Sequence, residues 1–172
     1  MAEDAYIGIG SNMGDRVRVC LLAVREIHRL PYTRVVAVSS LYETQPVGAS
    51  QTAWFINGAA HVKTDLPPLE LMRACLKIEE TVGRIRVERG EPRPLDLDLL
   101  LYGMRFLVAD EVTVPHPRMA SRRFVLEPLA EINREIVHPL LNKTIGTLLS
   151  ELEDPHTVLR IQPVDLEEVL AL

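Results

Sequence analysis

Residues 33–62 read TRVVAVSSLYETQPVGASQTAWFINGAAHV, and this stretch decides the fold. Its two ends, 33–42 and 53–62, are rich in β-branched residues or alternate along the chain in the way that is typical of β-strands. A loop from 44 to 52 joins them, with no helix between. Two successive strands without an intervening helix disfavour a doubly wound parallel sheet, so the sequence predicts an α+β fold.

The segments on either side of this pair continue a regular order. The expected elements are a strand at 5–9, a helix at 16–30, a helix at 65–82 and a strand at 96–102. The resulting order, β-α-β-β-α-β, predicts a ferredoxin-like sandwich, in which a mostly antiparallel sheet carries its main helices on one face. The helical addition beyond it comprises helices at 124–132 and 145–152, a strand at 158–161 and an acidic, helix-prone tail at 165–172.

Length and composition predict one globular domain spanning residues 1–172. The chain is 47% hydrophobic and 25% charged, which is typical of such domains. Its net charge of -5 disfavours nucleic acid and anionic membranes as partners, and no apolar run approaches the roughly 20 residues of a membrane span. Cys20 and Cys75 fall beside apolar neighbours in the expected helices. We expect both to be reduced core residues, which favours a cytoplasmic location.

The stretch from Arg84 to Asp98 joins a cationic segment to an acidic one. Four arginines lie in a part broken by one glycine and two prolines, which predicts a loop. Strand alternation then places Asp96 and Asp98 on one face, about 7 Å apart at a rise of about 3.3 Å per residue. Paired carboxylates can hold Mg²⁺ and guanidinium groups can hold phosphates, so this stretch predicts phosphoryl transfer. A solvated strand edge beside an ordinary surface loop is the alternative.

Two further positions are candidates for ligand contacts. Alternation places Phe55 and Asn57 on one strand face, where a buried amide is costly unless backbone or a polar ligand pairs with it. His116 stands between two prolines in a segment that also carries Arg118 and Arg122. A lone histidine is usually just a loop residue, and an isolated phenylalanine usually fills a core.

Five segments of the chain match one family in the family's own order. They are YIGIGSN at 6–12, SLYET at 40–44, FINGA at 55–59, PRPLDLDLL at 92–100 and VPHP at 114–117. With them the chain resembles the 6-hydroxymethyl-7,8-dihydropterin pyrophosphokinases of folate biosynthesis. The resemblance implies a transfer of pyrophosphate from ATP to the hydroxymethyl group of the reduced pterin, with release of AMP and with two Mg²⁺ ions as cofactors.

The resemblance also assigns roles to the residues that act on ATP. It implies that Asp96 and Asp98 hold the two Mg²⁺ ions and are catalytic. It implies that Arg84 and Arg93 are catalytic and bind the triphosphate. The remaining residues that it assigns to ATP phosphates are His116 and Arg122.

A second group is assigned to the pterin. The resemblance implies that the pterin ring lies between two aromatic rings and that an amide, a loop and one metal-binding aspartate read its polar edge. The corresponding residues of this chain are Phe55, Phe124, Asn57, Thr44, Val47 and Asp96.

Two other functions remain open at this point. One is a non-catalytic module that binds a nucleotide or a pterin, although such a module would not need both carboxylates. The other is a metal-dependent phosphohydrolase, which would leave the face of Phe55 and Asn57 unexplained. The partners expected from the favoured reading are small molecules, the pterin and ATP, bound by a monomer or weak homodimer.

Overall fold

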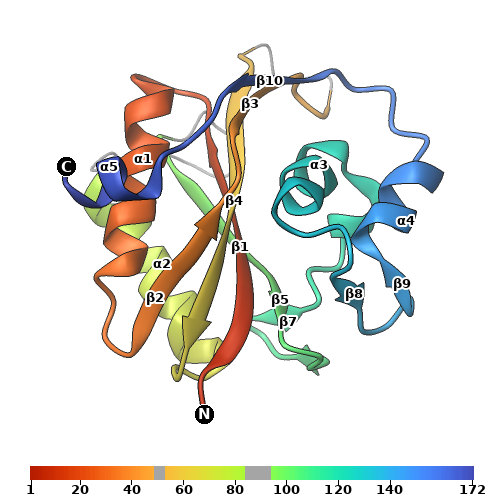
Figure 1. Cartoon of the computed structure of the whole chain (residues 1–172), viewed down its shortest axis with the longest axis horizontal. Helices are drawn as coiled ribbons and strands as arrows, with labels where there is room; N and C mark the ends of the chain where they lie inside the picture. The colour runs from red at the N-terminus through yellow and green to blue at the C-terminus, as the bar shows by residue number, and fades with distance from the viewer. Residues whose placement is uncertain (49–52, 84–93) are drawn as a thin grey trace.

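The computed structural model describes residues 1–48, 53–83 and 94–172. Figure 1 shows a central sheet nearly edge-on, with a layer of helices on each side. One layer consists of α1 (Arg16–His28), α2 (Pro68–Gly83) and α5 (Leu166–Leu170), and the other of α3 (Arg123–Ile132) and α4 (Ile145–Glu151). Within the described ranges, no helix is both long enough and apolar enough to cross a membrane.

The main sheet has the strand order β10-β3-β4-β1-β5, and β2 also pairs with β4. Every pairing in it is antiparallel. Its strands are β1 (Glu3–Ser11), β2 (Thr33–Val38), β3 (Leu41–Thr44), β4 (Phe55–Thr64), β5 (Asp96–Tyr102) and β10 (Val158–Gln162). The smaller elements are β6 (Leu107–Val108), β7 (Thr113–Val114), the 3₁₀ turn η1 (Met119–Ser121), β8 (Val137–His138) and β9 (Lys143–Thr144).

The predicted α+β sandwich with a mostly antiparallel sheet is confirmed. The strand expected at 33–42 is divided into β2 and β3, and both pair with β4. At the division, the Ser39 hydroxyl accepts the Ala59 N–H at 2.9 Å and donates to the Ser40 carbonyl at 2.7 Å. The Ser39 N–H still donates to the Ala59 carbonyl at 2.9 Å, so the side chain replaces only the backbone acceptor at this point of the ladder. Residue-type patterns alone do not reveal such a replacement.

Apolar side chains form a core on each face of the sheet. The larger core lies under α1 and α2 and contains Ile7, Leu97 and Leu99. The second core lies under α3 and α4, the helical addition, and contains Leu126 and Leu129. Strand alternation therefore directs Leu97 and Leu99 of β5 to one core and leaves Asp96 and Asp98, which alternate with them, facing the α3 side.

Helix α3 is tied to the sheet by a carboxylate near its end. Glu131 accepts hydrogen bonds from the Ser40 N–H at 3.0 Å, the Ser40 hydroxyl at 2.7 Å and the Tyr42 hydroxyl at 2.5 Å. Burial raises the pKa of Glu131, but these donors outweigh it and hold that pKa below its usual value. The ionised carboxylate thus fixes α3 against β3, next to the face on which the aspartates lie.

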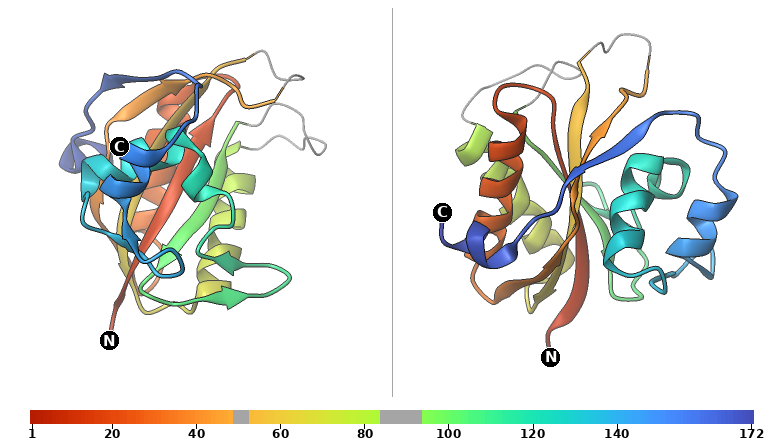
Figure 2. Two further views of the ribbon diagram at one scale, coloured as in Figure 1. Left: turned by 90° about the vertical axis from the view of Figure 1, so that its right-hand side faces the viewer. Right: turned by 45° about the horizontal axis from the view of Figure 1, so that its top comes forward.

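Both cysteines are buried free thiols in the larger core. Burial raises the pKa of Cys20 and of Cys75 to about 12, so both stay protonated at neutral pH. The segment expected as an acidic tail forms α5, whose Val169 is buried in the same core. Figure 2 shows that the chain reaches α5 by passing from the α4 side over one end of the sheet to β10.

Candidate active site

The floor of the candidate site is the face of the sheet that looks toward α3. In the register of β5, β1 and β4, Asp96 lies opposite Gly10, and Gly10 lies opposite Asn57. Asp98 lies opposite Gly8 in the same way. Because neither glycine carries a side chain, the space between the two carboxylates and the Asn57 amide stays open.

Gly10 is the tighter of the two glycine positions. A Cβ atom there would lie 2.6 Å from Oδ1 of Asn57, a distance that real Cβ atoms do not show. The amide itself is buried, and its Nδ2 donates to the Thr44 hydroxyl at 2.6 Å. This bond turns Oδ1 toward Gly10 and fixes the orientation of the amide at the floor.

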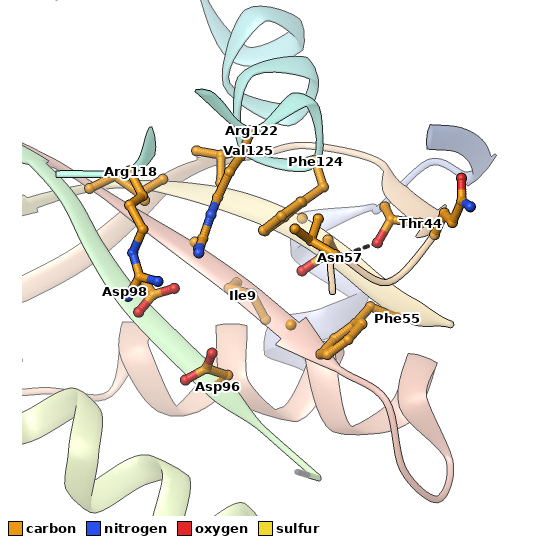
Figure 3. A pocket seen from close by; sticks show the side chains of 16 residues that line it. Ile9, Thr44, Phe55, Asn57, Asp96, Asp98, Arg118, Arg122, Phe124 and Val125 are labelled. Carbon is orange, nitrogen blue, oxygen red and sulfur yellow. Dashed lines mark hydrogen bonds between the residues drawn. The ribbon is translucent and has the colours of Figure 1, made fainter. Parts of the chain in front are cut away.

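The roof of the site comes from the N-terminal turn of α3 and the segment before it. Arg118, Arg122, Phe124 and Val125 line a cavity of about 310 Å³ together with the floor residues. Figure 3 shows that Arg118 and Arg122 point down toward the Asp98 end of β5, while the Phe124 ring lies over Asn57. Phe55 extends from β4 on the other side of Asn57. Aromatic rings thus gather at one end of the cavity and charges at the other.

The carboxylate end is held in place by α2. The backbone N–H of Leu97, between the two aspartates, donates to Oε1 of Glu79 at 2.7 Å. Among the described residues no three metal-ligating side chains cluster together. Mg²⁺, however, is usually bound by one or two carboxylates, with phosphate oxygens and water completing its shell. Asp96 and Asp98 therefore fit a Mg²⁺ site that a phosphate-bearing ligand completes.

Of the two cationic groups above β5, Arg122 is partly buried and Arg118 is exposed, and together they make an anionic ligand favourable. Burial and the nearby Arg118 charge lower the pKa of Arg122, and Asp98 and Asp96 partly oppose this. The Arg122 guanidinium also lies 5.4 Å from the centre of the Phe124 ring. Guanidinium groups stay protonated at neutral pH, so two like charges face the same cavity and a phosphate between them would relieve their repulsion.

His116 adds a neutral hydrogen-bond donor beside this cluster. Its backbone N–H donates to the Leu100 carbonyl at 2.8 Å, which attaches the segment to β5. Burial, followed by the charges of Arg122 and Arg118, lowers the pKa of His116. Its Nδ1 accepts the Arg118 N–H at 3.2 Å, so in the neutral ring Nε2 carries the proton and can donate to an anion.

A second cavity of about 270 Å³ shares Asp98 with the first and is also lined by His116. Its walls are Met72 of α2 and the β6–β7 hairpin from Ala109 to Thr113. Sequence reasoning missed this cavity, because the hairpin residues form no recognisable pattern and come near α2 only in the folded chain. Asp98 lines both cavities, so a long ligand in the second can present its phosphates to a ligand in the first.

The family model described as 7,8-dihydro-6-hydroxymethylpterin-pyrophosphokinase (HPPK) matches residues 6–134. The chain belongs to this family. A curated HPPK relative from Bacillus subtilis (strain 168), a 2-amino-4-hydroxy-6-hydroxymethyldihydropteridine pyrophosphokinase, is 46% identical over 136 residues, which are 79% of this chain and 81% of that protein. A relative of the same name from Methylorubrum extorquens is 38% identical over 92% of this chain and 98% of its own length.

Longer proteins contain the HPPK fold as one part. The folic acid synthesis protein fol1 of Schizosaccharomyces pombe is 36% identical over 86% of this chain, which spans only 20% of that protein. The structure of a Plasmodium falciparum HPPK-DHPS triple mutant matches with a TM-score of 0.69 at 16% identity, over 88% of this chain and 43% of that one. At this identity the match shows the fold alone, and it agrees with the sandwich described above.

The structure brings together most of the residues that the sequence had singled out as the HPPK site. Eight of them line the first cavity: Thr44, Val47, Phe55, Asn57, Asp96, Asp98, Arg122 and Phe124. His116 lines the second cavity, together with Asp98. Arg84 and Arg93 lie outside the described residues. Sequence reasoning did not assign Gly8, Gly10 or Arg118, although the two glycines share a strand face by alternation and Arg118 lies in the arginine-rich segment.

Proposed function

We propose that this chain transfers the pyrophosphoryl group of ATP to the hydroxymethyl group of 6-hydroxymethyl-7,8-dihydropterin. The products are AMP and the pterin diphosphate, and the reaction is a step of tetrahydrofolate biosynthesis. Membership of the HPPK family supports the overall activity, and the curated relatives carry the name of this enzyme. The observation that carries the residue roles is that two cavities share Asp98, while its partner Asp96 lines the first cavity and two arginines lie above.

The first cavity suits the pterin. A flat, polar heterocycle can stack on the rings of Phe55 and Phe124, and such stacking is favourable beyond the area that it buries. Asn57 offers an acceptor and a donor in a fixed orientation, which matches the mixed edge of a pterin. Thr44 and Val47 line the same end of the cavity, so the loop after β3 can contact that edge through its backbone.

The second cavity is proposed for the nucleoside of ATP. It opens next to Asp98 and His116, so a nucleoside bound there directs its phosphates toward the carboxylates and the roof arginines. Arg118, Arg122 and the Nε2–H of His116 are placed to bind those phosphates. For Arg84 and Arg93, binding of the triphosphate is proposed from the family resemblance alone.

Asp96 and Asp98 would hold Mg²⁺ through their carboxylates, two ions by the family resemblance. When bound, the metal neutralises charge on the phosphate oxygens and aligns them. The pterin hydroxyl, held near the same carboxylates, attacks the β-phosphorus of ATP, and the bond to the α-phosphate oxygen breaks to release AMP. A carboxylate of β5 orients the hydroxyl and can accept its proton as the new bond forms. The arginines bind the charge that builds up on the transferred group.

The chain is proposed to act as a single domain on these small molecules, as a monomer or weak homodimer in the cytoplasm. Neither nucleic acid nor a membrane has a role in the proposed reaction. The family relatives that are longer carry additional segments, so their further activities are not proposed for this chain.

A product assay tests the proposed function. The protein is incubated with ATP and Mg²⁺, with and without the pterin, and AMP is separated from ADP. AMP that forms only with the pterin, in equal amount to the pterin diphosphate, supports the proposal. Release of ADP would indicate ordinary kinase or hydrolase chemistry, and binding of both ligands without turnover would indicate a binding module.

A further inference from the structure

The first turn of α3 carries two residues of the roof but lacks a cap of its own. The N-cap position is Arg122, which makes no side-chain hydrogen bond to the helix. Ser, Thr, Asp and Asn are preferred there because they accept the exposed N–H groups of the first turn. Arg122 points into the cavity instead (Figure 3). The functional side chain therefore occupies the position that helix stability would assign to a capping residue.

Asp154 supplies the missing cap from the C-terminal segment of the chain. Its Oδ2 accepts the backbone N–H of Arg123 at 2.9 Å, and its side chain is only 7% exposed. The Arg123 guanidinium returns two bonds, each of 3.3 Å, to the carbonyls of Asp154 and Leu152. A negative charge at a helix N-terminus also interacts favourably with the helix dipole. Arg122 and Phe124 flank the residue that is held in this way.

The Asp154 carboxylate is itself held by its own turn. Its Oδ1 accepts from the His156 N–H at 3.0 Å and lies 2.5 Å from Nδ1 of the His156 ring. Burial raises the pKa of Asp154, but the N–H groups of Arg123 and His156 and the His156 ring outweigh it and hold that pKa below its usual value. The side chain is therefore an ionised, oriented acceptor at neutral pH.

The same turn is bonded to the opposite wall of the first cavity. The Gln45 N–H donates to the Thr157 carbonyl at 2.9 Å, and the Thr157 N–H donates to Oε1 of Gln45 at 3.1 Å. Directly after it, Val158 pairs with Thr44 where β10 meets β3. Thr44 and Gln45 line the cavity. Residues 154–157 thus bond to the roof at one end and to the wall at the other.

We propose that Asp154 is a positioning residue for the pterin and for Arg122, which sets the height of the α3 roof over the floor of the first cavity. Residues 154–157 act as a strap of fixed length between α3 and the loop after β3. Without the Asp154 carboxylate, the first turn of α3 loses its cap and its tie to the strap. Phe124 then no longer holds a stacking distance over Asn57, and Arg122 no longer holds its place above β5. The inference rests on the proposed function of the cavity.

Asp165 offers a matched control. It caps α5 in the same manner, by accepting the N–H groups of Glu167 at 2.9 Å and Glu168 at 3.2 Å. Asp165 lies among the residues of a small surface hollow near α1, and α5 lies on the opposite side of the sheet from α3. Asp165→Ala thus removes the same kind of bond without touching the strap or the cavity.

The test compares Asp154→Ala, Asp154→Asn and Asp165→Ala with the unaltered protein. The pterin Kd and the AMP Kd are measured by calorimetry, kcat by AMP formation, and Tm by circular dichroism. For Asp154→Ala we expect a pterin Kd raised at least fivefold, a kcat lowered at least fivefold and an AMP Kd within twofold. Asp154→Asn keeps one acceptor oxygen, so its pterin Kd and kcat should lie between those of Asp154→Ala and those of the unaltered protein. For Asp165→Ala we expect the pterin Kd, the AMP Kd and kcat to stay within twofold, although its Tm falls.

Several outcomes would overturn the inference. Equal losses of pterin and AMP binding in Asp154→Ala would show a general structural role. A pterin Kd of Asp154→Ala that stays within twofold, as expected for Asp165→Ala, would show that Asp154 does not position the pterin. If Asp154→Ala does not fold, an unchanged pterin Kd and kcat in Asp154→Asn would also overturn the inference. Failure of the unaltered protein to form AMP from ATP and pterin would instead contradict the proposed function, so the two failures are distinguishable.

Discussion

Substituting Gly10 with alanine tests the open floor of the cavity most directly. The new Cβ would lie 2.6 Å from Oδ1 of Asn57, so the buried amide has to move by several tenths of an ångström. Movement strains or breaks the 2.6 Å bond from Nδ2 of Asn57 to the Thr44 hydroxyl. A buried polar group that loses its partner costs about 1–3 kcal/mol. If the amide also reads the pterin edge, the same range corresponds to a loss of about 5- to 150-fold in pterin affinity.

The assay is a titration of the folded variant with pterin in the absence of ATP, with circular dichroism to verify the fold. Gly8→Ala is the matched control, because it places a methyl group on the same strand and the same face. The nearest atoms to its Cβ belong to the Leu100 side chain, at 3.4 Å and beyond, which is ordinary van der Waals contact. Gly8 lies opposite Asp98 and Ala59 rather than opposite Asn57, so its methyl group leaves the amide in place. We therefore expect its pterin Kd to change less than about threefold. A folded Gly10→Ala variant that binds pterin as tightly as the unaltered protein would refute the role of Asn57.

The remaining predictions concern the metal, the aromatic roof and the histidine. Asp98→Asn should lower kcat at least about a hundredfold, because a metal-binding charge is lost, while its pterin Kd measured without ATP changes little; near-normal kcat would contradict the metal assignment. Phe124→Ala should weaken pterin binding by about 1–2 kcal/mol, and Phe124→Leu should recover only the part due to burial, so equal affinities in both would argue against stacking. His116 has a lowered pKa when folded, so the unfolded chain binds its proton more readily and stability should fall as the pH drops below about 6.5. In urea unfolding, His116→Gln should lose less stability between pH 7.5 and pH 5.5 than the unaltered protein does. An unchanged pH dependence would show that His116 does not cause the loss.

Fold class was predictable because it depends on local periodicity. The absence of a helix between the strands of residues 33–62 disfavoured a doubly wound sheet, and alternation alone placed Asp96 and Asp98 on one face. The division of one expected strand into β2 and β3 was not predictable, because it depends on bonds between Ser39 and Ala59, twenty residues apart. The placement of α3 and α4 on the second face likewise follows from packing over the whole sheet.

The candidate site shows the same contrast. Matching segments identified the family, and the resemblance assigned eight of the 16 residues that line the first cavity. They did not identify Gly8 and Gly10 as the gap that keeps the floor open, because a glycine's role depends on what its missing side chain would meet. The second cavity was not predicted for a similar reason. Its walls come from α2 and a hairpin, which are distant in the sequence, and no single matching segment contains both.

By itself, the sequence determined the kinds of element, the shared face of the carboxylate pair and the family, because residue type and spacing act over a few positions of the chain. Only the tertiary structure decided which face the second helical layer covers, which residues stand opposite the carboxylates and what caps α3. Asp154 and Arg123 are 31 residues apart, and their bond exists because the C-terminal segment returns across the end of the sheet. Such contacts depend on the pairing and packing of distant segments, which backbone periodicity does not encode.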